Sequence, residues 1–247
     1  MDKRWIPRGE GFSLYLRPTV ISTWPYLGVS TAQSIKLFVV ACPVGPYYAT
    51  GFKPTTLYAD AANVRAWPGG TGDSKLGGNY APTIRHLNDV AARGFSQTLW
   101  LFGSGGGGQV TEVGTMNFFV VWRTPAGRTE LATAPLDGTI LPGVTRQSIL
   151  DLARARWPDV DVAEKHFTID DVAAAAGSGR LLEAFGAGTA AVVSPVKKIH
   201  VAATGADIDV PCGAPADGAG PIARRAWNEL ADIQYGRVAH PWSVVVG

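Results

Sequence analysis

The sequence predicts a mixed α/β protein of the α+β class, in which mostly antiparallel strands are flanked by helices. Segments rich in β-branched and aromatic residues alternate with Gly- and Pro-rich turns, a pattern typical of strands and hairpins. Other segments repeat apolar residues at helical spacing. The 247 residues are 46% hydrophobic and 17% charged, which is enough for one large or two small globular domains.

The N-terminal part predicts a pair of strands followed by a linker. Residues 11–21 and 34–46 have strand composition, and the turn residues TWPYLG between them favour their pairing. The next stretch, PVGPYYATGFKPT, is dense in Gly and Pro and has no period, which is typical of a linker. We therefore expect a two-stranded unit over residues 1–46, a linker over 47–57 and a large domain over 58–247.

The rest of the chain predicts helices between hairpins. Asn79 and Pro82 open one helix that Gly94 ends, and Thr168 with Asp171 three positions later is close to a capping box. The other expected elements are helices over 143–156 and 222–236 and strands over 98–103, 109–122, 128–136, 160–167 and 181–201, the last with a glycine turn inside it.

Composition and charge exclude several classes of function. The net charge is +2 and the basic residues are scattered, so we expect neither nucleic acid nor a membrane surface as a partner. No apolar run approaches the roughly 18 residues that span a bilayer, and no secretory signal is recognised. Cys42 and Cys212 belong to no CxxC pair, so we expect no metal. Free thiols indicate a reducing compartment, and we expect a cytoplasmic location.

The stretch GDSKLGGNYAPT, from Gly72 to Thr83, places a single lysine, Lys75, among glycines and near Tyr80. An enzyme that holds an aldehyde cofactor as a Schiff base needs a lysine, and flanking glycines let a planar ring approach the backbone. A surface turn with a solvated lysine has the same pattern. The stretch alone leaves both interpretations open.

Glu112 is a carboxylate in the otherwise apolar strand segment VTEVGTMNFF. One interpretation is an edge strand with Glu112 in water. In the other, the acid is buried and needs a partner, which would be a pyridinium nitrogen. Such a bond keeps the ring protonated, so that the ring can accept electrons.

Two glycine turns are candidate anion sites. GAGTAA, residues 186–191, fits GxGxxA, but a strand follows it where a dinucleotide site needs a helix. The backbone at Gly188 and the hydroxyl of Thr189 can bind a phosphate, or the segment is a plain tight turn. In LPGVTR, the N–H groups of Val144 and Thr145 stand at a helix N-terminus, where the dipole favours an anion. No GxSxG, HExxH or P-loop pattern is present, so we expect neither a hydrolase nor an NTPase site.

Together these motifs resemble the branched-chain amino acid aminotransferases of fold type IV, which use pyridoxal 5'-phosphate (PLP). The resemblance rests on KLGGNY, TEVGTMN, LPGVTRQSILDLA, AFGAGTAAVVSPV and IQYGR, with SLYLRP and LFVVACPVGPYY, and it runs through nearly the whole chain. It implies a large PLP-binding domain, built as a pseudo-barrel of mostly antiparallel strands with flanking helices. It also implies that residues 1–46 are a remnant of a small domain.

The resemblance implies a role for each residue around the cofactor. Lys75 is the expected catalytic residue, as Schiff-base lysine and proton carrier. Tyr80 would bond the phenolic oxygen of the cofactor and Glu112 its pyridine nitrogen, while Leu141 would pack against the ring. The expected phosphate contacts are the backbone of Val144 and Thr145 and the hydroxyl of Thr189.

The substrate side of the site is assigned by the same resemblance. Thr115 and Ala190 would lie near the substrate carboxylate, and Tyr47 would be an aromatic of the linker. Leu14 and Leu16 would be lent by the partner subunit, so the resemblance implies a homodimer. The expected substrates are branched-chain amino acids and 2-oxoglutarate.

Two departures from the family pattern bear on activity. Family members carry roughly a further third of a chain before Met1, including an arginine that clamps the PLP phosphate. The CxxC of animal members is absent, with Ala191 and Ser194 at its positions, so thiol regulation is not expected. Without the arginine that clamps the phosphate, PLP binding is expected to be weakened. The alternatives are a truncated relative that works without PLP, as a cyclase, an isomerase or a binding protein, and a fragment of an ordinary enzyme.

Overall fold

The protein was analysed as a computed structural model, which describes residues 5, 9, 11–45, 53–103, 107–213 and 218–245. The chain divides into two compact units, Met1–Gly51 and Phe52–Gly247. Each unit is described by itself. The expected linker over 47–57 lies largely outside the described residues, and its last three residues form the beginning of a strand.

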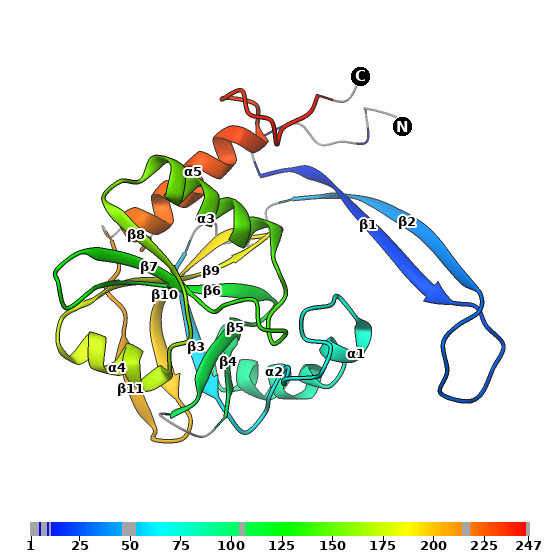
Figure 1. Ribbon diagram of the computed structural model, residues 1–247, viewed down its shortest axis with the longest axis horizontal. Coiled ribbons are helices and arrows are strands. Elements are labelled where there is room, and N and C mark those ends of the chain that lie inside the picture. Colours follow the sequence, from blue (N-terminus) through cyan, green and yellow to red (C-terminus); the bar gives the residue numbers. More distant parts are fainter. Residues whose placement is uncertain are drawn as a thin grey trace. The chain divides into compact units, whose positions relative to one another are not determined.

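The first unit is a two-stranded antiparallel ribbon (Figure 1). β1 (Ser13–Ser22) pairs with β2 (Ile35–Val44) along their whole length, so the predicted pairing is confirmed. Residues opposite one another share a face, and faces alternate along each strand. We call one of them the apolar face: it carries Leu14, Leu16, Pro18, Val20, Ile35, Leu37, Val39, Ala41 and Pro43, with Ser22 as its polar member.

The described part of the second unit contains nine strands, and six of them build a closed ring. From β10 the hydrogen-bonded order runs through β3, β4, β5 and β6, and β9 pairs with both β6 and β10. β7 and β8 continue the sheet beyond β6, and β11 pairs with β10. The strand bounds are β3 Thr55–Asp60, β4 Gln97–Phe102, β5 Gln109–Val113, β6 Met116–Arg123, β7 Thr129–Thr133, β8 Val160–Glu164, β9 Leu181–Gly188, β10 Val192–Val201 and β11 Ala206–Asp209.

Most of the strand pairs are antiparallel. The parallel pairs among the described strands are β3 with β4, β3 with β10, and β7 with β8. The predicted α+β class and the pseudo-barrel of mostly antiparallel strands are thereby confirmed. The sequence did not predict β11, because its four residues, ADID, are too few and too polar to stand out. It did not predict β3 either, because the first half of that strand falls in the stretch expected to be the linker.

Helices follow the predicted segments with one difference. A single helix was expected to open around Asn79, yet the chain forms α1 (Gly77–Tyr80) and then α2 (Thr83–Ala92). Pro82 lies between them, and because it has no N–H it cannot continue the helical hydrogen bonds. The remaining helices are α3 (Val144–Arg156), α4 (Ile169–Gly177) and α5 (Pro221–Gln234).

Helix ends confirm two predictions made from single residues. Gly94 follows α2 with a φ of +87°, the left-handed conformation that favours glycine. Thr168 and Asp171 form a complete capping box at α4, each side chain accepting from the backbone N–H of the other. Among the described helices, none combines the length and the apolar composition that crossing a membrane requires.

Two hydrophobic clusters pack on opposite faces of the ring. Successive residues of β6 alternate between them: Phe118 and Val120 join the cluster that α4 closes, while Phe119 and Val121 join the one that α3 and α5 cover. Figure 1 shows α3 and α5 on one side of the sheet and α4 on the other. The ring is therefore a packed core, and the site has to lie at its rim.

A buried carboxylate fixes α5 to the sheet. Glu183 of β9 accepts hydrogen bonds from the backbone N–H groups of Ile222 (2.8 Å) and Ala223 (2.9 Å), in the first turn of the helix. Its negative charge therefore lies at the positive end of the helix dipole. Added side-chain volume at the adjoining Gly220 would collide with this carboxylate.

Candidate active site

Strand register brings three of the predicted site positions, Glu112, Thr115 and Thr189, to one rim of the ring. Glu112 of β5 pairs with Asn117 of β6, which in turn pairs with Ala187 of β9. The turn that contains Thr115 precedes Asn117, and the turn that contains Thr189 follows Ala187. Both turns therefore lie at the same end of these strands.

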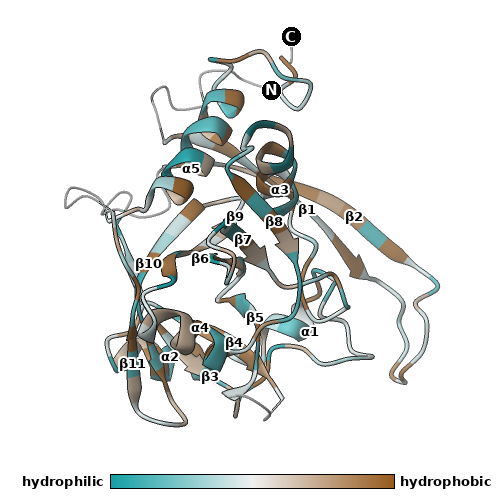
Figure 2. Ribbon diagram, turned by 60° about the vertical axis from the view of Figure 1, so that its left-hand side comes forward, coloured by the Kyte–Doolittle hydropathy of each residue, from teal (hydrophilic) through white to brown (hydrophobic). Residues whose placement is uncertain are grey.

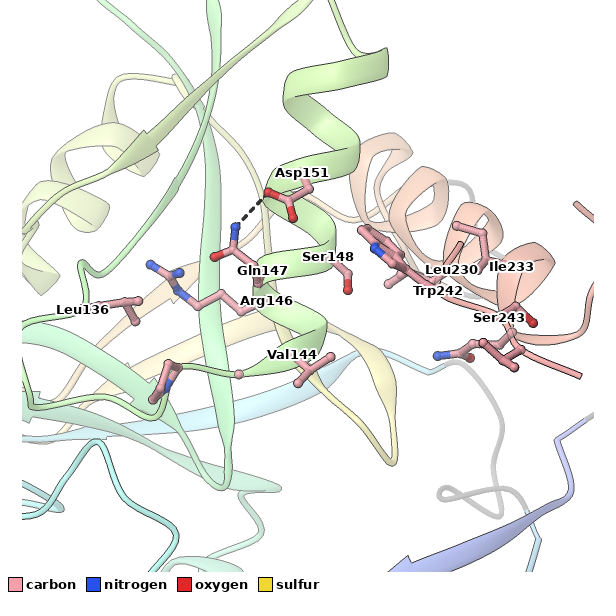
Figure 3. A pocket seen from close by; sticks show the side chains of 14 residues that line it. Leu136, Val144, Arg146, Gln147, Ser148, Asp151, Leu230, Ile233, Trp242 and Ser243 are labelled. Atoms are coloured by element: carbon pink, nitrogen blue, oxygen red, sulfur yellow. Dashed lines mark hydrogen bonds between the residues drawn. The ribbon is translucent and has the colours of Figure 1, made fainter. Parts of the chain in front are cut away.

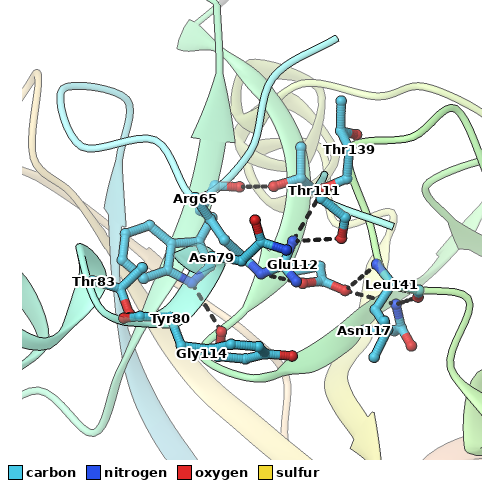
Figure 4. A network of polar contacts seen from close by, with 12 residues as sticks. Arg65, Asn79, Tyr80, Thr83, Thr111, Glu112, Gly114, Asn117, Thr139 and Leu141 are labelled. Carbon is cyan, nitrogen blue, oxygen red and sulfur yellow. Dashed lines mark hydrogen bonds and ion pairs between the residues drawn. The ribbon is translucent and has the colours of Figure 1, made fainter. Parts of the chain in front are cut away.

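Glu112 is buried, which excludes the solvated edge-strand interpretation. Its Oε1 accepts hydrogen bonds from Asn117 Nδ2 (3.1 Å) and from the backbone N–H of Leu141 (2.9 Å), and its Oε2 lies 2.7 Å from Arg65 Nε (Figure 4). A carboxylate offers about four acceptor positions, two on each oxygen. One position on Oε2 is therefore left for a further donor.

Burial raises the pKa of Glu112 from its ordinary 4.5 to about 7. Arg65, the Leu141 N–H and Lys75 all act in the opposite direction, by favouring the charged carboxylate. A pKa near neutrality in a carboxyl group with specific charged partners is typical of functional sites.

Arg65 is a residue of the candidate site that the sequence did not identify. Its guanidinium pairs with Glu112 and donates from Nη1 to the carbonyl oxygens of Gly72 (3.1 Å) and Thr139 (3.3 Å). It also lies 5.9 Å from the centre of the Tyr80 ring. The requirement for a partner at Glu112 was visible in the sequence, but nothing in the letters VRAW identified that partner.

The loop that carries Lys75 is fastened by Asn79. Asn79 Nδ2 donates to the carbonyl oxygens of Thr71 (2.5 Å) and Ser74 (2.8 Å), and its Oδ1 accepts from the Thr71 hydroxyl (2.7 Å). Lys75 follows directly and has an exposed side chain. Tyr80, at the end of α1, is half-buried. Lys75 and Tyr80 thus lie on a loop and a short helix whose backbone Asn79 holds at Thr71 and Ser74.

The loop before α3 is joined to Glu112 through Asn117. Asn117 Nδ2 donates to the Leu141 carbonyl (2.8 Å), and a Cβ on Gly143 would collide with Asn117 Oδ1. Glycine is therefore required here for close approach. Gly143 is the N-cap of α3 and supplies no side-chain hydrogen bond to the first turn, where Val144 is exposed and Thr145 is buried.

The remaining predicted residues lie in turns of the second unit, on the ribbon or outside the described residues. Thr115, Thr189 and Ala190 are exposed in their turns. Leu14 and Leu16 lie on the apolar face of the ribbon, in the other unit. Tyr47 lies outside the described residues.

A cavity of about 850 Å³ lies elsewhere, between α3, α5 and residues 242–244 (Figure 3). Val144 lines its edge, but Lys75 and Glu112 do not. The candidate site is therefore defined by the chemistry of its residues. In the described part of the chain no cluster of His, Cys, Asp and Glu could hold a metal ion, and Cys42 and Cys212 are free thiols.

A family model described as amino-transferase class IV matches residues 4–199. The chain belongs to the class IV aminotransferase family. The buried acid on β5 and the glycine-flanked lysine of the loop before α1 are thus features of an aminotransferase-family domain.

Sequence relatives of this family member are branched-chain aminotransferases. The branched-chain-amino-acid aminotransferase of Monosiga brevicollis is 51% identical over 245 residues, which cover 99% of this chain and 61% of that protein. The cytosolic one of Saccharomyces cerevisiae is 50% identical over 249 residues, covering 99% and 65%. The chain therefore spans about three fifths of the length of these relatives.

Solved structures of the family share the fold. The branched-chain aminotransferase from Escherichia coli matches with a TM-score of 0.69 at 21% identity, covering 94% of this chain and 68% of that one. The branched-chain aminotransferase from Thermobaculum terrenum, solved in its PLP form, matches with a TM-score of 0.68 at 22% identity, covering 91% and 65%.

Proposed function

We propose that this aminotransferase-family chain binds PLP at the rim around Glu112 and transfers the amino group between branched-chain amino acids and 2-oxoglutarate. The observation that carries the proposal is Glu112 itself. It is a buried carboxylate with one acceptor position left, and it is joined to the loops of Lys75 and Leu141. The names of the relatives support the choice of branched-chain amino acids.

The residues present fit this cofactor. The free position on Glu112 Oε2 suits the protonated nitrogen of a pyridine ring, which needs an anionic acceptor away from water. The first turn of α3, at Val144 and Thr145, presents backbone N–H groups and the positive end of a helix dipole to a phosphate. The Thr189 hydroxyl and the side chains of Tyr80 and Leu141 complete the proposed contacts.

The chain's own residues would orient the reactants and move the proton. Bound PLP supplies an electron sink, and Glu112 keeps the ring nitrogen protonated for that purpose. Lys75 Nζ would hold the cofactor at rest and, once the substrate amine replaces it, take the α-proton and return it. Tyr80 would hold the phenolic oxygen. Thr115 and Ala190, at the rim, would position the substrate carboxylate.

The ribbon would complete the site from a second copy. Leu14 and Leu16 lie on its apolar face, and the exposure of that face supports an assembly that covers it. We therefore propose a homodimer in which these leucines border the partner's site and Tyr47 lines the linker side. Residues 1–46 would then be a remnant of the family's small domain, and 47–57 its linker.

The test is PLP binding by the purified chain. Addition of PLP is expected to give an absorption band that Lys75→Ala abolishes and that the exposed control Lys197→Ala keeps. Borohydride treatment should then attach the cofactor to the peptide that contains Lys75. A band that is absent from the wild-type protein, or that survives Lys75→Ala, would sink the proposal.

The same experiment addresses the alternative of a relative that works without PLP. That function would leave the activity of the Lys75→Ala variant undiminished in an assay of the chain's native conversion or binding. A Lys75-dependent band together with transamination of leucine, isoleucine or valine would exclude it.

A further inference from the structure

We propose that Arg65 is a positioning residue of this site: it orients the Glu112 carboxylate and joins the Lys75 loop to the loop before α3, without touching the cofactor. The inference rests on the proposed function for its catalytic meaning. Its structural part concerns the PLP-free chain and can be tested alone.

One guanidinium contacts the carboxylate and both loops. Arg65 Nε lies 2.7 Å from Glu112 Oε2, while Nη1 bonds the carbonyl of Gly72, three positions before Lys75, and that of Thr139, two positions before Leu141. The donors of a guanidinium lie in one rigid plane. The carboxylate and both loops are consequently fixed relative to one another by a single planar group, as Figure 4 shows.

The pair is dry. The side chains of Arg65 and Glu112 are each 3% exposed, so their charges are poorly screened by water. Removal of one member would leave the other buried without its charge partner, which a protein avoids by changing its protonation state. Without Arg65, Glu112 would then be expected to stay protonated well above neutral pH.

Other groups that face Glu112 do not replace Arg65. Lys75, from the loop before α1, acts on it at longer range and has an exposed side chain. Asn117 of β6 and the Leu141 N–H are uncharged donors. Tyr80 of α1 faces Arg65 itself. Among the described residues, Arg65 is therefore the charged group in direct contact with this acid.

The mechanistic consequence follows from the acceptor position on Oε2. A protonated Glu112 would offer an O–H donor where the ring nitrogen needs an anionic acceptor, so the ring would lose its proton and its capacity as an electron sink. Arg65 thereby acts on the cofactor only through Glu112. Loss of Arg65 should lower kcat more than it raises KM for the amino acid.

The first measurement is the titration of Glu112 in PLP-free protein labelled with ¹³C at the glutamate carboxyl, with Glu112→Gln to assign the signal. The wild-type midpoint is expected at about pH 7. In Arg65→Met it should rise by about one to three pH units. Arg65→Lys keeps the positive charge but not the planar set of donors, so its midpoint should lie between those of the wild type and Arg65→Met. An unchanged midpoint in Arg65→Met would overturn the proposal.

A matched control separates this role from the loss of any buried arginine. Arg146 is also buried and lies 2.7 Å from Glu164 through Nη2. Arg146→Met should lower the melting temperature while leaving the Glu112 midpoint where it is. If Arg65→Met does not fold, the double variant Arg65→Met/Glu112→Gln, which removes both charges, should restore a cooperative thermal transition. A double variant that also fails to fold would contradict the pairing.

The second measurement uses PLP. The Lys75-dependent absorption band of Arg65→Met is expected to respond to pH over a different range from that of the wild type, with Arg65→Lys in between. If the wild-type chain lacks the band, the proposed function is wrong. The carboxyl titration in PLP-free protein would still test whether Arg65 positions Glu112. A band whose pH response is identical in wild type and Arg65→Met would defeat the positioning role alone.

Discussion

Two strands of this protein share a four-residue segment of nearly the same sequence, which has opposite environments in the two. In β2 the residues LFVV, 37–40, are between 39% and 65% exposed, whereas in β6 the residues FFVV, 118–121, are all 0% exposed. Figure 2 shows the ribbon strands with long hydrophobic stretches, and the described residues of their own unit supply no second layer that covers them.

The difference comes from the neighbours of each strand. β6 pairs with β5, β7 and β9 and has helices over the clusters on both of its faces, while β2 pairs with β1. The amino-acid pattern therefore predicts that a strand forms, but burial depends on the layers that the rest of the chain supplies.

The largest difference is expected from truncating a phenylalanine in each strand. Phe119→Ala in β6 should lower the free energy of unfolding by about 3–5 kcal/mol, because it leaves a cavity beside Phe185, whose ring centre lies 5.1 Å away. Phe38→Ala in β2 should change it by about 0.5 kcal/mol or less. Urea unfolding measures both. Equal losses would show that the ribbon face is covered in solution.

The next effect is the pH dependence of stability. It also distinguishes the two regions, because the described part of the ribbon, 11–45, contains no Asp, Glu or His. Glu112 has a folded-state pKa of about 7 against an ordinary 4.5, so as pH rises the unfolded chain loses this proton first. Protonated Glu112 therefore contributes on the order of 3 kcal/mol to the free energy of unfolding below pH 4.5, and this contribution should be lost as pH rises to 7.

The measurement compares the unfolding free energy of PLP-free wild type and Glu112→Gln at several pH values. Their difference should decline across that interval, and any constant effect of the glutamine cancels. A difference independent of pH between 4.5 and 7 would mean that Glu112 is ionised throughout.

A smaller effect is expected at the carboxylate that holds α5. Glu183→Gln removes the negative charge and one acceptor from the helix N-terminus, and should cost about 1–3 kcal/mol. Asp161→Asn, at an exposed pair with Arg128, is the matched control and should leave the melting temperature nearly unchanged. If both variants melt together, the contact with α5 does not stabilise the fold.

The smallest effect on stability is expected from a charge on the apolar face. Val39→Lys should change the free energy of unfolding by less than about 0.5 kcal/mol. It should nevertheless weaken self-association in sedimentation velocity, because a lysine must be desolvated in any assembly that covers the face. Val40→Lys, on the opposite face, is the control. Identical sedimentation of both variants and wild type would exclude this face as the interface.

Local patterns predicted much of the fold, while contacts across long sequence separations were not visible. The strands, the capping box at Thr168 and the stop at Gly94 depend on residues close together in the chain. The ring closure by β9 and the partner of Glu112 depend on register, which the letters do not state. Asn79 and Asn117 read as ordinary turn and strand residues because their roles come from the carbonyl groups that folding brings to them.

The closure of the ring also has a consequence for synthesis. Thr55 of β3 bonds the Pro195 carbonyl of β10 across 140 positions, so one edge of β3 has no partner until that segment emerges. At roughly 5–20 residues per second, translation leaves this edge open for roughly 7–28 s. An open strand edge pairs readily with other chains, so aggregation during synthesis competes with folding over this interval. The strand contact that closes the barrel is among the last that a ribosome makes available.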